Sequence, residues 1–135
     1  MLMNNYSRAD VGFVRGDGAI LWDDSGKDYI DFASGIGVCA LGHSHKGVAK
    51  IISKQSKTLL HTSNLYNIAP QTRLANKISN LLGGEYELFF ANSGAEANEC
   101  AIKLARKFGY KQGKKSEIIS LANSFHGRTI ATLAM

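Results

Sequence analysis

Residues 86–99 read Tyr-Glu-Leu-Phe-Phe-Ala-Asn-Ser-Gly-Ala-Glu-Ala-Asn-Glu, and this stretch decides the fold that we predict. Its first part, Tyr86 to Ala91, is a nearly continuous apolar run, which is typical of a strand buried on both faces. Apolar residues then recur at helical spacing over about 93–110, and a second apolar run follows at 117–122. A strand, a helix and a strand within ~35 residues have the size of a βαβ unit. We therefore predict an α/β fold with a parallel, helix-covered sheet.

The preceding residues predict smaller elements. Short apolar runs separated by Asp-Gly and Asp-Ser-Gly turns indicate antiparallel strands at 13–15, 19–22 and 29–32. Helical periodicity predicts one helix over 48–59. A second helix is predicted from Pro70, with Gly83-Gly84 as its end.

Composition restricts the class of protein. Hydrophobic residues make up 44% and charged residues 20%, which is ordinary for a soluble globular chain. No apolar run approaches the ~20 residues that cross a bilayer, and residues 1–6 do not resemble a secretory signal. We read Cys39 and Cys100 as free thiols and expect a cytoplasmic location. The net charge of +5 includes a lysine cluster at 107–115, but no aromatic-studded basic groove accompanies it, so we expect no nucleic-acid partner.

Two loops follow the predicted strands of the parallel sheet, and parallel strands place both loops at one edge. In the first, Ser93 is a good N-cap, and Glu96 completes a capping box that takes the backbone N–H of Ser93. Gly94 and Ala95 carry almost no side chain, so a phosphate can approach their backbone N–H groups at the helix N-terminus. The same pattern also fits a capped helix start without a ligand.

The second loop, Asn123 to Arg128, adds an aromatic and a cationic side chain. Phe125 can cover the face of a planar ring, and Arg128 can grip a carboxylate with two parallel hydrogen bonds. A core phenylalanine beside a surface arginine is the alternative reading. Because both loops share one sheet edge, we predict that they form two walls of one crevice.

Four ordered motifs resemble the class III pyridoxal-phosphate-dependent aminotransferases, whose fold is fold type I. These are Leu41-Gly42-His43-Ser44-His45, His61-Thr62-Ser63-Asn64-Leu65-Tyr66, Asn92 to Glu99 with Lys103 to Arg106, and Asn123 to Thr129. The resemblance extends from about Tyr6 to Met135. Within the family, the motif at 61–66 and His126 make the chain most similar to acetylornithine and succinylornithine aminotransferases. Lys46 departs from the family, which usually has proline there.

The resemblance implies a role for each residue of the two loops. Gly94 and Ala95 would donate backbone N–H groups to the phosphate of pyridoxal 5'-phosphate, with Ser93 opening that helix. Phe125 would stack on the pyridine ring, and Arg128 would bind the carboxylate of the substrate. The turn around Ile36 to Val38 would border the substrate pocket.

The resemblance also implies a reaction and an organisation. The reaction is transfer of an amino group from N-acetylornithine, or a similar ω-amino donor, to the 2-oxo acid 2-oxoglutarate. The resemblance places this reaction in arginine biosynthesis and implies that the enzyme is a homodimer. Residues 1–62 would belong to the small domain, and residues 63–135 would begin the cofactor-binding large domain. No lysine of this chain matches the family's Schiff-base lysine, so we expect a fragment that is inactive alone.

Two other functions fit parts of the sequence. Gly35, Gly37 and Ala40 fit a dinucleotide-binding fingerprint of an oxidoreductase, which requires a helix opening within that run and a later acidic residue. No aspartate or glutamate occurs between Asp31 and Glu85, which disfavours it. A non-enzymatic metal-binding module would use His43 and His45 with His61 or His126, although a structural zinc site needs four ligands.

Overall fold

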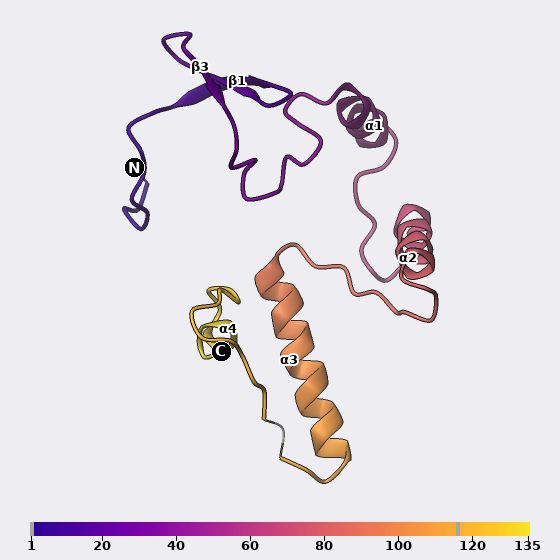
Figure 1. Ribbon diagram of the computed structural model, residues 1–135. Helices are drawn as coiled ribbons and strands as arrows, with labels where there is room; N and C mark the ends of the chain where they lie inside the picture. The colour runs from indigo at the N-terminus through magenta and orange to yellow at the C-terminus, as the bar shows by residue number, and fades with distance from the viewer. Residues whose placement is uncertain (1, 116) are drawn as a thin grey trace. The chain divides into compact units, whose positions relative to one another are not determined.

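The computed structural model describes residues 2–115 and 117–135, and its contacts divide the chain into two compact units. The first unit, Met1–Tyr66, contains strands β1 (Phe13–Asp17), β2 (Ile20–Asp23) and β3 (Asp28–Ile30) and helix α1 (Lys46–Ser56). The second unit, Asn67–Met135, contains helices α2 (Ala69–Leu81), α3 (Gly94–Lys111) and α4 (Ile130–Leu133). Figure 1 colours both units along the chain. No helix in the described ranges is long and apolar enough to cross a membrane.

The three strands form one antiparallel sheet in the order β1-β2-β3, which confirms the predicted hairpins. Gly18 turns the chain between β1 and β2 with a φ of 53°, a conformation that glycine adopts without steric cost. The second turn is organised by Asp23, whose carboxylate accepts hydrogen bonds from the backbone N–H groups of Ser25 and Lys27 and from the Tyr29 hydroxyl. Aspartate side chains close turns in this way.

The segment after the glycine-rich turn returns to the first hairpin. Gly18 and His43 exchange two backbone hydrogen bonds of 3.1 and 2.8 Å, and the Ser44 hydroxyl donates to the carbonyl oxygen of Gly16. A Cβ atom at Gly16 would lie only 2.7 Å from the His43 ring, so this close approach requires glycine. The segment that contains His43 therefore packs directly on β1 and its turn.

The helices begin and end near the predicted residues. The side chain of His45 caps α1 by accepting from the backbone N–H of Val48. Pro70 lies in the first turn of α2, and Gly83 and Gly84 follow its end with positive φ angles. Proline suits the first turn because its missing N–H has no intrahelical partner there, and glycine tolerates the left-handed backbone that ends a helix.

The predicted parallel βαβ unit is wrong in one respect. Helix α3 forms as expected, but neither 86–91 nor 117–122 is a strand. A strand exists only through hydrogen bonds to its neighbours, and within the described residues these two segments pair neither with each other nor with a third segment. Apolar side chains of both segments are exposed to solvent, Phe89 to 67% and Ile119 to 94%.

The core of the described residues is small. Ile102, on α3, is the one buried hydrophobic residue among them, and Asp23 and Thr132 are the buried polar residues. Thr132 lies on α4, which contacts α3 in the second unit (Figure 1). The packing that matters for the predicted site is therefore the packing of α4 and its preceding loop against α3.

Candidate functional site

The N-terminus of α3 forms the first wall of the candidate site. Ser93 has an extended backbone, with φ −154° and ψ 161°, and its hydroxyl accepts a 3.2 Å hydrogen bond from the backbone N–H of Glu96. The backbone N–H of Ala97 makes the first intrahelical bond, to the carbonyl oxygen of Ser93. Of the four orphan donors that a helix start carries, those of Ser93, Gly94 and Ala95 have no partner among the described residues.

Glu96 differs from the predicted capping box. Its carboxylate accepts a 2.5 Å hydrogen bond from the backbone N–H of Asn92, one residue before the predicted partner, Ser93. The side chain thus turns back past the serine and fixes the entry of the chain into the helix. An acidic side chain in the first helical turn is also favoured by the helix dipole.

The geometry at Gly94 and Ala95 fits a phosphate group. A Cβ atom built on Gly94 meets nothing within 4 Å, so the space beside this backbone is open. Two backbone N–H groups, an open approach and the positive end of an 18-residue helix are what an anion needs at such a position.

The Asn123–Arg128 loop forms the second wall and is tied to α3 by a side chain. The Nδ2 atom of Asn98 donates a 2.7 Å hydrogen bond to the backbone carbonyl oxygen of His126. The Nε2 atom of His126 is buried and has no hydrogen-bond partner among the described residues. The two predicted loops therefore lie together in one unit, although the paired strands expected to bring them together are missing from the described ranges.

Gly127 allows this close contact. A Cβ atom at this position would lie 2.7 Å from the Cβ atom of Ala95 and 2.6 Å from the hydroxyl oxygen of Thr132. Its φ of 137° also lies in the region that favours glycine. The backbone of the second loop thus packs directly on Ala95, one of the two residues predicted to hold the phosphate.

A second set of hydrogen bonds, made by Thr129, also connects the loop to α3. The hydroxyl of Thr129 donates to the carboxylate of Glu99, and the backbone N–H of Thr129 donates to the Thr132 hydroxyl at 3.0 Å. Thr129 is the N-cap residue of α4. Two consecutive residues of α3, Asn98 and Glu99, therefore form hydrogen bonds with His126 and Thr129 of the following segment. Sequence reasoning missed both, because polar residues on a helix are normally read as its solvated face.

Phe125 and Arg128 project from this loop. Phe125 is 76% exposed, so its ring face is available to a ligand, and the guanidinium carbon of Arg128 lies 5.7 Å from the centre of that ring. A cation at this distance is attracted by the ring face. The structure brings the N-terminus of α3, an exposed aromatic ring and a guanidinium into one neighbourhood of the second unit.

The predicted pocket-bordering turn lies in the first unit. Ile36 and Val38 are exposed, and Ile36 has a φ of 60°. Val38 lines a hollow of about 380 Å³ that continues along 39–45 to the first turns of α1. The run containing Gly35, Gly37 and Ala40 forms turns, and the next helix begins only at Lys46. The helix start that a dinucleotide fingerprint needs is therefore absent from this described segment.

Two of the four histidines, His43 and His45, have partners other than a metal ion. His43 pairs with Asp31, and His45 caps α1. No group of three or more side chains able to ligate a metal occurs in the part of the chain that the structure describes. The structure thus gives no support to a metal-binding module.

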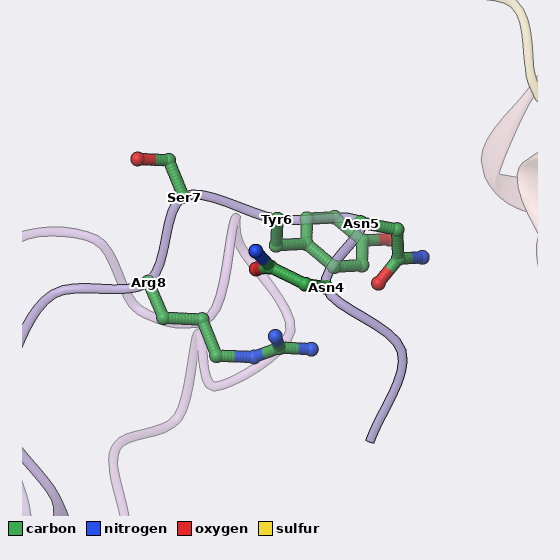
Figure 2. A pocket seen from close by; sticks show the side chains of 5 residues that line it. All are labelled: Asn4, Asn5, Tyr6, Ser7 and Arg8. Atoms are coloured by element: carbon green, nitrogen blue, oxygen red, sulfur yellow. The ribbon is translucent and has the colours of Figure 1, made fainter. Parts of the chain in front are cut away.

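A further hollow lies at the N-terminus. Figure 2 shows the side chains that line it, from Asn4 to Arg8. The guanidinium carbon of Arg8 lies 5.5 Å from the centre of the Tyr6 ring. Its volume is about 530 Å³, and no predicted site residue lines it.

A helix N-terminus beside an exposed aromatic ring and a guanidinium suits a phosphorylated planar ligand, and comparison with known proteins identifies the family. The family model for class III aminotransferases matches residues 2–135. The chain is 56% identical to an acetylornithine aminotransferase of Wolinella succinogenes, over 98% of this chain and 34% of that enzyme. The chain belongs to the class III aminotransferases, which are pyridoxal-phosphate-dependent.

Solved structures agree with this result. The crystal structure of N-acetylornithine aminotransferase from Stenotrophomonas maltophilia matches 90% of this chain and 34% of its own, with 41% identity and a TM-score of 0.82. The structure of a Bacillus anthracis aminotransferase matches 99% of this chain and 31% of its own, with 32% identity and a TM-score of 0.90. The predicted fold class is confirmed. The chain spans about a third of the length of the relatives it matches.

Proposed function

We propose that the protein carrying this chain transfers an amino group from N-acetylornithine, or a similar ω-amino donor, to 2-oxoglutarate. The observation that carries the proposal is the 2.7 Å hydrogen bond from Asn98 to His126, which ties the loop bearing Phe125 and Arg128 to the N-terminus of α3. Three groups with the right chemistry for a phosphate, a ring and a carboxylate thereby share one site. When bound, pyridoxal phosphate supplies an electron sink for an amine-bearing carbon that loses a proton.

The residues divide the binding work between them. The backbone N–H groups of Gly94 and Ala95 hold the cofactor phosphate at the helix N-terminus that Ser93 opens. Phe125 covers one face of the cofactor ring, and its exposure of 76% leaves that face accessible. In this proposal these residues would hold the cofactor ring in place beside Arg128.

Arg128 binds the carboxylate of the substrate. A guanidinium presents its donors in a planar fork that matches a carboxylate, and the ring of Phe125 beside it limits the directions that the fork can take. Ile36 to Val38 border the substrate pocket in this proposal. The support for that role is the membership of the chain in the aminotransferase family.

The wider assignments rest on the relatives. Two of the matched proteins are named acetylornithine and N-acetylornithine aminotransferase, which supports an N-acetylated ornithine donor and a place in arginine biosynthesis. We assign residues 1–62 to a small domain and 63–135 to the start of the cofactor-binding domain, in a cytoplasmic homodimer. The division of contacts at Tyr66 and Asn67 lies close to the proposed boundary.

The 135-residue chain alone is proposed to be inactive. Transamination in this family requires a lysine that carries the cofactor, and no lysine of this chain stands in a matching context. The lysines nearest to the phosphate site in sequence, Lys103 and Lys107, lie further along α3 and are exposed.

The test uses a full-length chimera in which this chain replaces the matched third of the Wolinella enzyme. Amino transfer to 2-oxoglutarate is measured with N-acetylornithine, N-succinylornithine and ornithine as donors. We expect turnover with an N-acylated donor at the highest kcat/KM. A folded chimera that binds pyridoxal phosphate but prefers ornithine would overturn the donor assignment. A folded chimera that binds no cofactor would overturn the assignment of the site.

A further inference from the structure

Consecutive polar residues on α3 hold the loop that carries Phe125 and Arg128. Asn98 donates from Nδ2 to the carbonyl oxygen of His126 at 2.7 Å, and Glu99 accepts from the hydroxyl of Thr129. The first bond grips the residue after Phe125, and the second grips the residue after Arg128. The two bonds therefore hold the chain immediately after Phe125 and immediately after Arg128.

The positions along α3 matter as well. Asn98 and Glu99 lie one turn beyond Gly94 and Ala95, whose N–H groups face the proposed phosphate. Between the two bonds, the backbone at Gly127 touches Ala95 so closely that no side chain fits. The distance from the helix end to the second loop is thus set by contacts within one unit of the protein.

We propose that Asn98 and Glu99 are positioning residues, which keep Phe125 and Arg128 in register with the phosphate site on the same helix. The inference rests on the proposed function of that site. Neither residue needs to touch the cofactor or the substrate. Their effect is transmitted through His126 and Thr129, because a loop held at two points loses less freedom when a ligand binds than a loop that is free.

The chain offers matched variants. Asn98→Asp keeps the size of the side chain but replaces its donor with an acceptor that faces the carbonyl oxygen of His126. Thr129→Val keeps the shape and removes the hydroxyl. The controls are Thr129→Ser, which retains the hydroxyl, and Glu99→Gln, which retains an acceptor oxygen.

The first measurement is hydrogen exchange of the full-length chimera without cofactor, compared between the segments 123–129 and 94–111. We expect Asn98→Asp and Thr129→Val to accelerate exchange in 123–129 and to leave 94–111 unchanged. Both controls should exchange like the parent. Equal loss of protection in both segments would show that these residues support the helix itself, and unchanged exchange in 123–129 would show that they hold nothing; either result overturns the proposal.

The second measurement is the affinity for pyridoxal phosphate, with the circular dichroism of the bound cofactor as a report on ring orientation. Asn98→Asp loses one ordinary hydrogen bond, which should weaken binding roughly 2- to 10-fold and reduce the dichroic signal per bound cofactor. Thr129→Val also loses the contact with the Thr132 hydroxyl and should weaken binding at least as much. Unaltered affinity and dichroism in both variants would contradict a positioning role. If the parent chimera binds no cofactor, the proposed function fails, while the exchange result still decides whether the loop is held by Asn98 and Glu99.

Discussion

The carboxylate of Asp31 lies 2.7 Å from the Nε2 atom of His43, across a connection that contains the glycine-rich turn. The other carboxylate oxygen accepts from the backbone N–H groups of Ala33 and Ser34. The hydrogen bond from His43, followed by that from Ser34, lowers the pKa of Asp31 below its usual value. Asp31 thereby fastens both ends of the turn that contains Ile36 and Val38.

This pair predicts an acid-sensitive turn. A carboxyl group whose pKa is lowered on folding stabilises the folded state above its ordinary pKa of 3.8. That stabilisation is lost as the pH falls through the lower value of the folded state. We therefore expect Asp31→Asn to lower the thermal midpoint of the chimera at pH 6, with the difference shrinking below pH ~4.

Two further measurements complete this test. In a carboxyl titration followed by nuclear magnetic resonance, His43→Ala should move the pKa of Asp31 up toward its ordinary value. Asp10→Asn, at an exposed aspartate, serves as the control for a lost charge. A difference in midpoint between Asp31→Asn and the parent that is the same at pH 3 and pH 6 would contradict the assignment.

Gly127→Ala should separate the two walls of the site. The added Cβ atom would meet Ala95 at 2.7 Å and Thr132 at 2.6 Å, at a φ of 137° that disfavours alanine. Overpacking of this kind costs about 1–3 kcal/mol. We expect a lower thermal midpoint of the chimera and weaker binding of pyridoxal phosphate. Gly12→Ala is the control, since its Cβ atom would meet nothing within 4 Å; equal behaviour of the two variants would argue against the contact.

Arg128→Lys should damage substrate handling and spare the cofactor. Each hydrogen bond to a charged group contributes about 1.5–3 kcal/mol, so losing a two-pronged grip should lower kcat/KM by roughly two to four orders of magnitude. Lysine cannot reproduce the fork of the guanidinium. Steady-state kinetics of the chimera beside a cofactor titration measure both effects, with Arg73→Lys on α2 as the control. Near-normal kcat/KM, or a large loss of cofactor, would mean that Arg128 has another role.

The 135-residue chain alone should form no covalent bond with pyridoxal phosphate. Borohydride reduction of a stoichiometric mixture, followed by peptide mapping, reveals any lysine that has reacted. We expect only weak, scattered labelling, because no lysine stands in the family's context. One lysine labelled in full would refute this, and the intact Wolinella relative provides the positive control.

The local elements were predictable because their signals are local. Turn residues such as Gly18 and the spacing of apolar side chains are sufficient for β1 to β3 and for α1 to α3. The segments 86–91 and 117–122 carry the apolar pattern of buried strands, yet neither forms one here. A strand depends on hydrogen-bonding neighbours, which can lie far away in the sequence, so an apolar run alone cannot determine it.

The candidate site was predictable in its parts and less so in its assembly. The residue types alone predict an N-cap at Ser93, an aromatic face at Phe125 and a carboxylate-binding guanidinium at Arg128. The two loops lie in one unit, as predicted. The means of assembly was missed, since the contacts run through Asn98 and Glu99 to backbone and side-chain groups 28 and 30 positions later. The available signal was two adjacent polar residues next to the buried face of α3, which contains Ile102.

Because of the hydrogen bond between Asn98 and His126, the geometry of the site does not depend on the length of the chain that connects its two walls. The chain leaves along α3, about 27 Å for 18 residues, turns at Gln112 to Lys115 and comes back. Because the returning end is fastened beside the start of the helix, the far turn can lengthen with little effect on the site, as doubling a loop costs only ~0.6 kcal/mol. For protein engineering, the exposed turn after Gly113 is an insertion point for an epitope or a reporter. Residues added at this turn should leave the contacts at the opposite end of the helix in place.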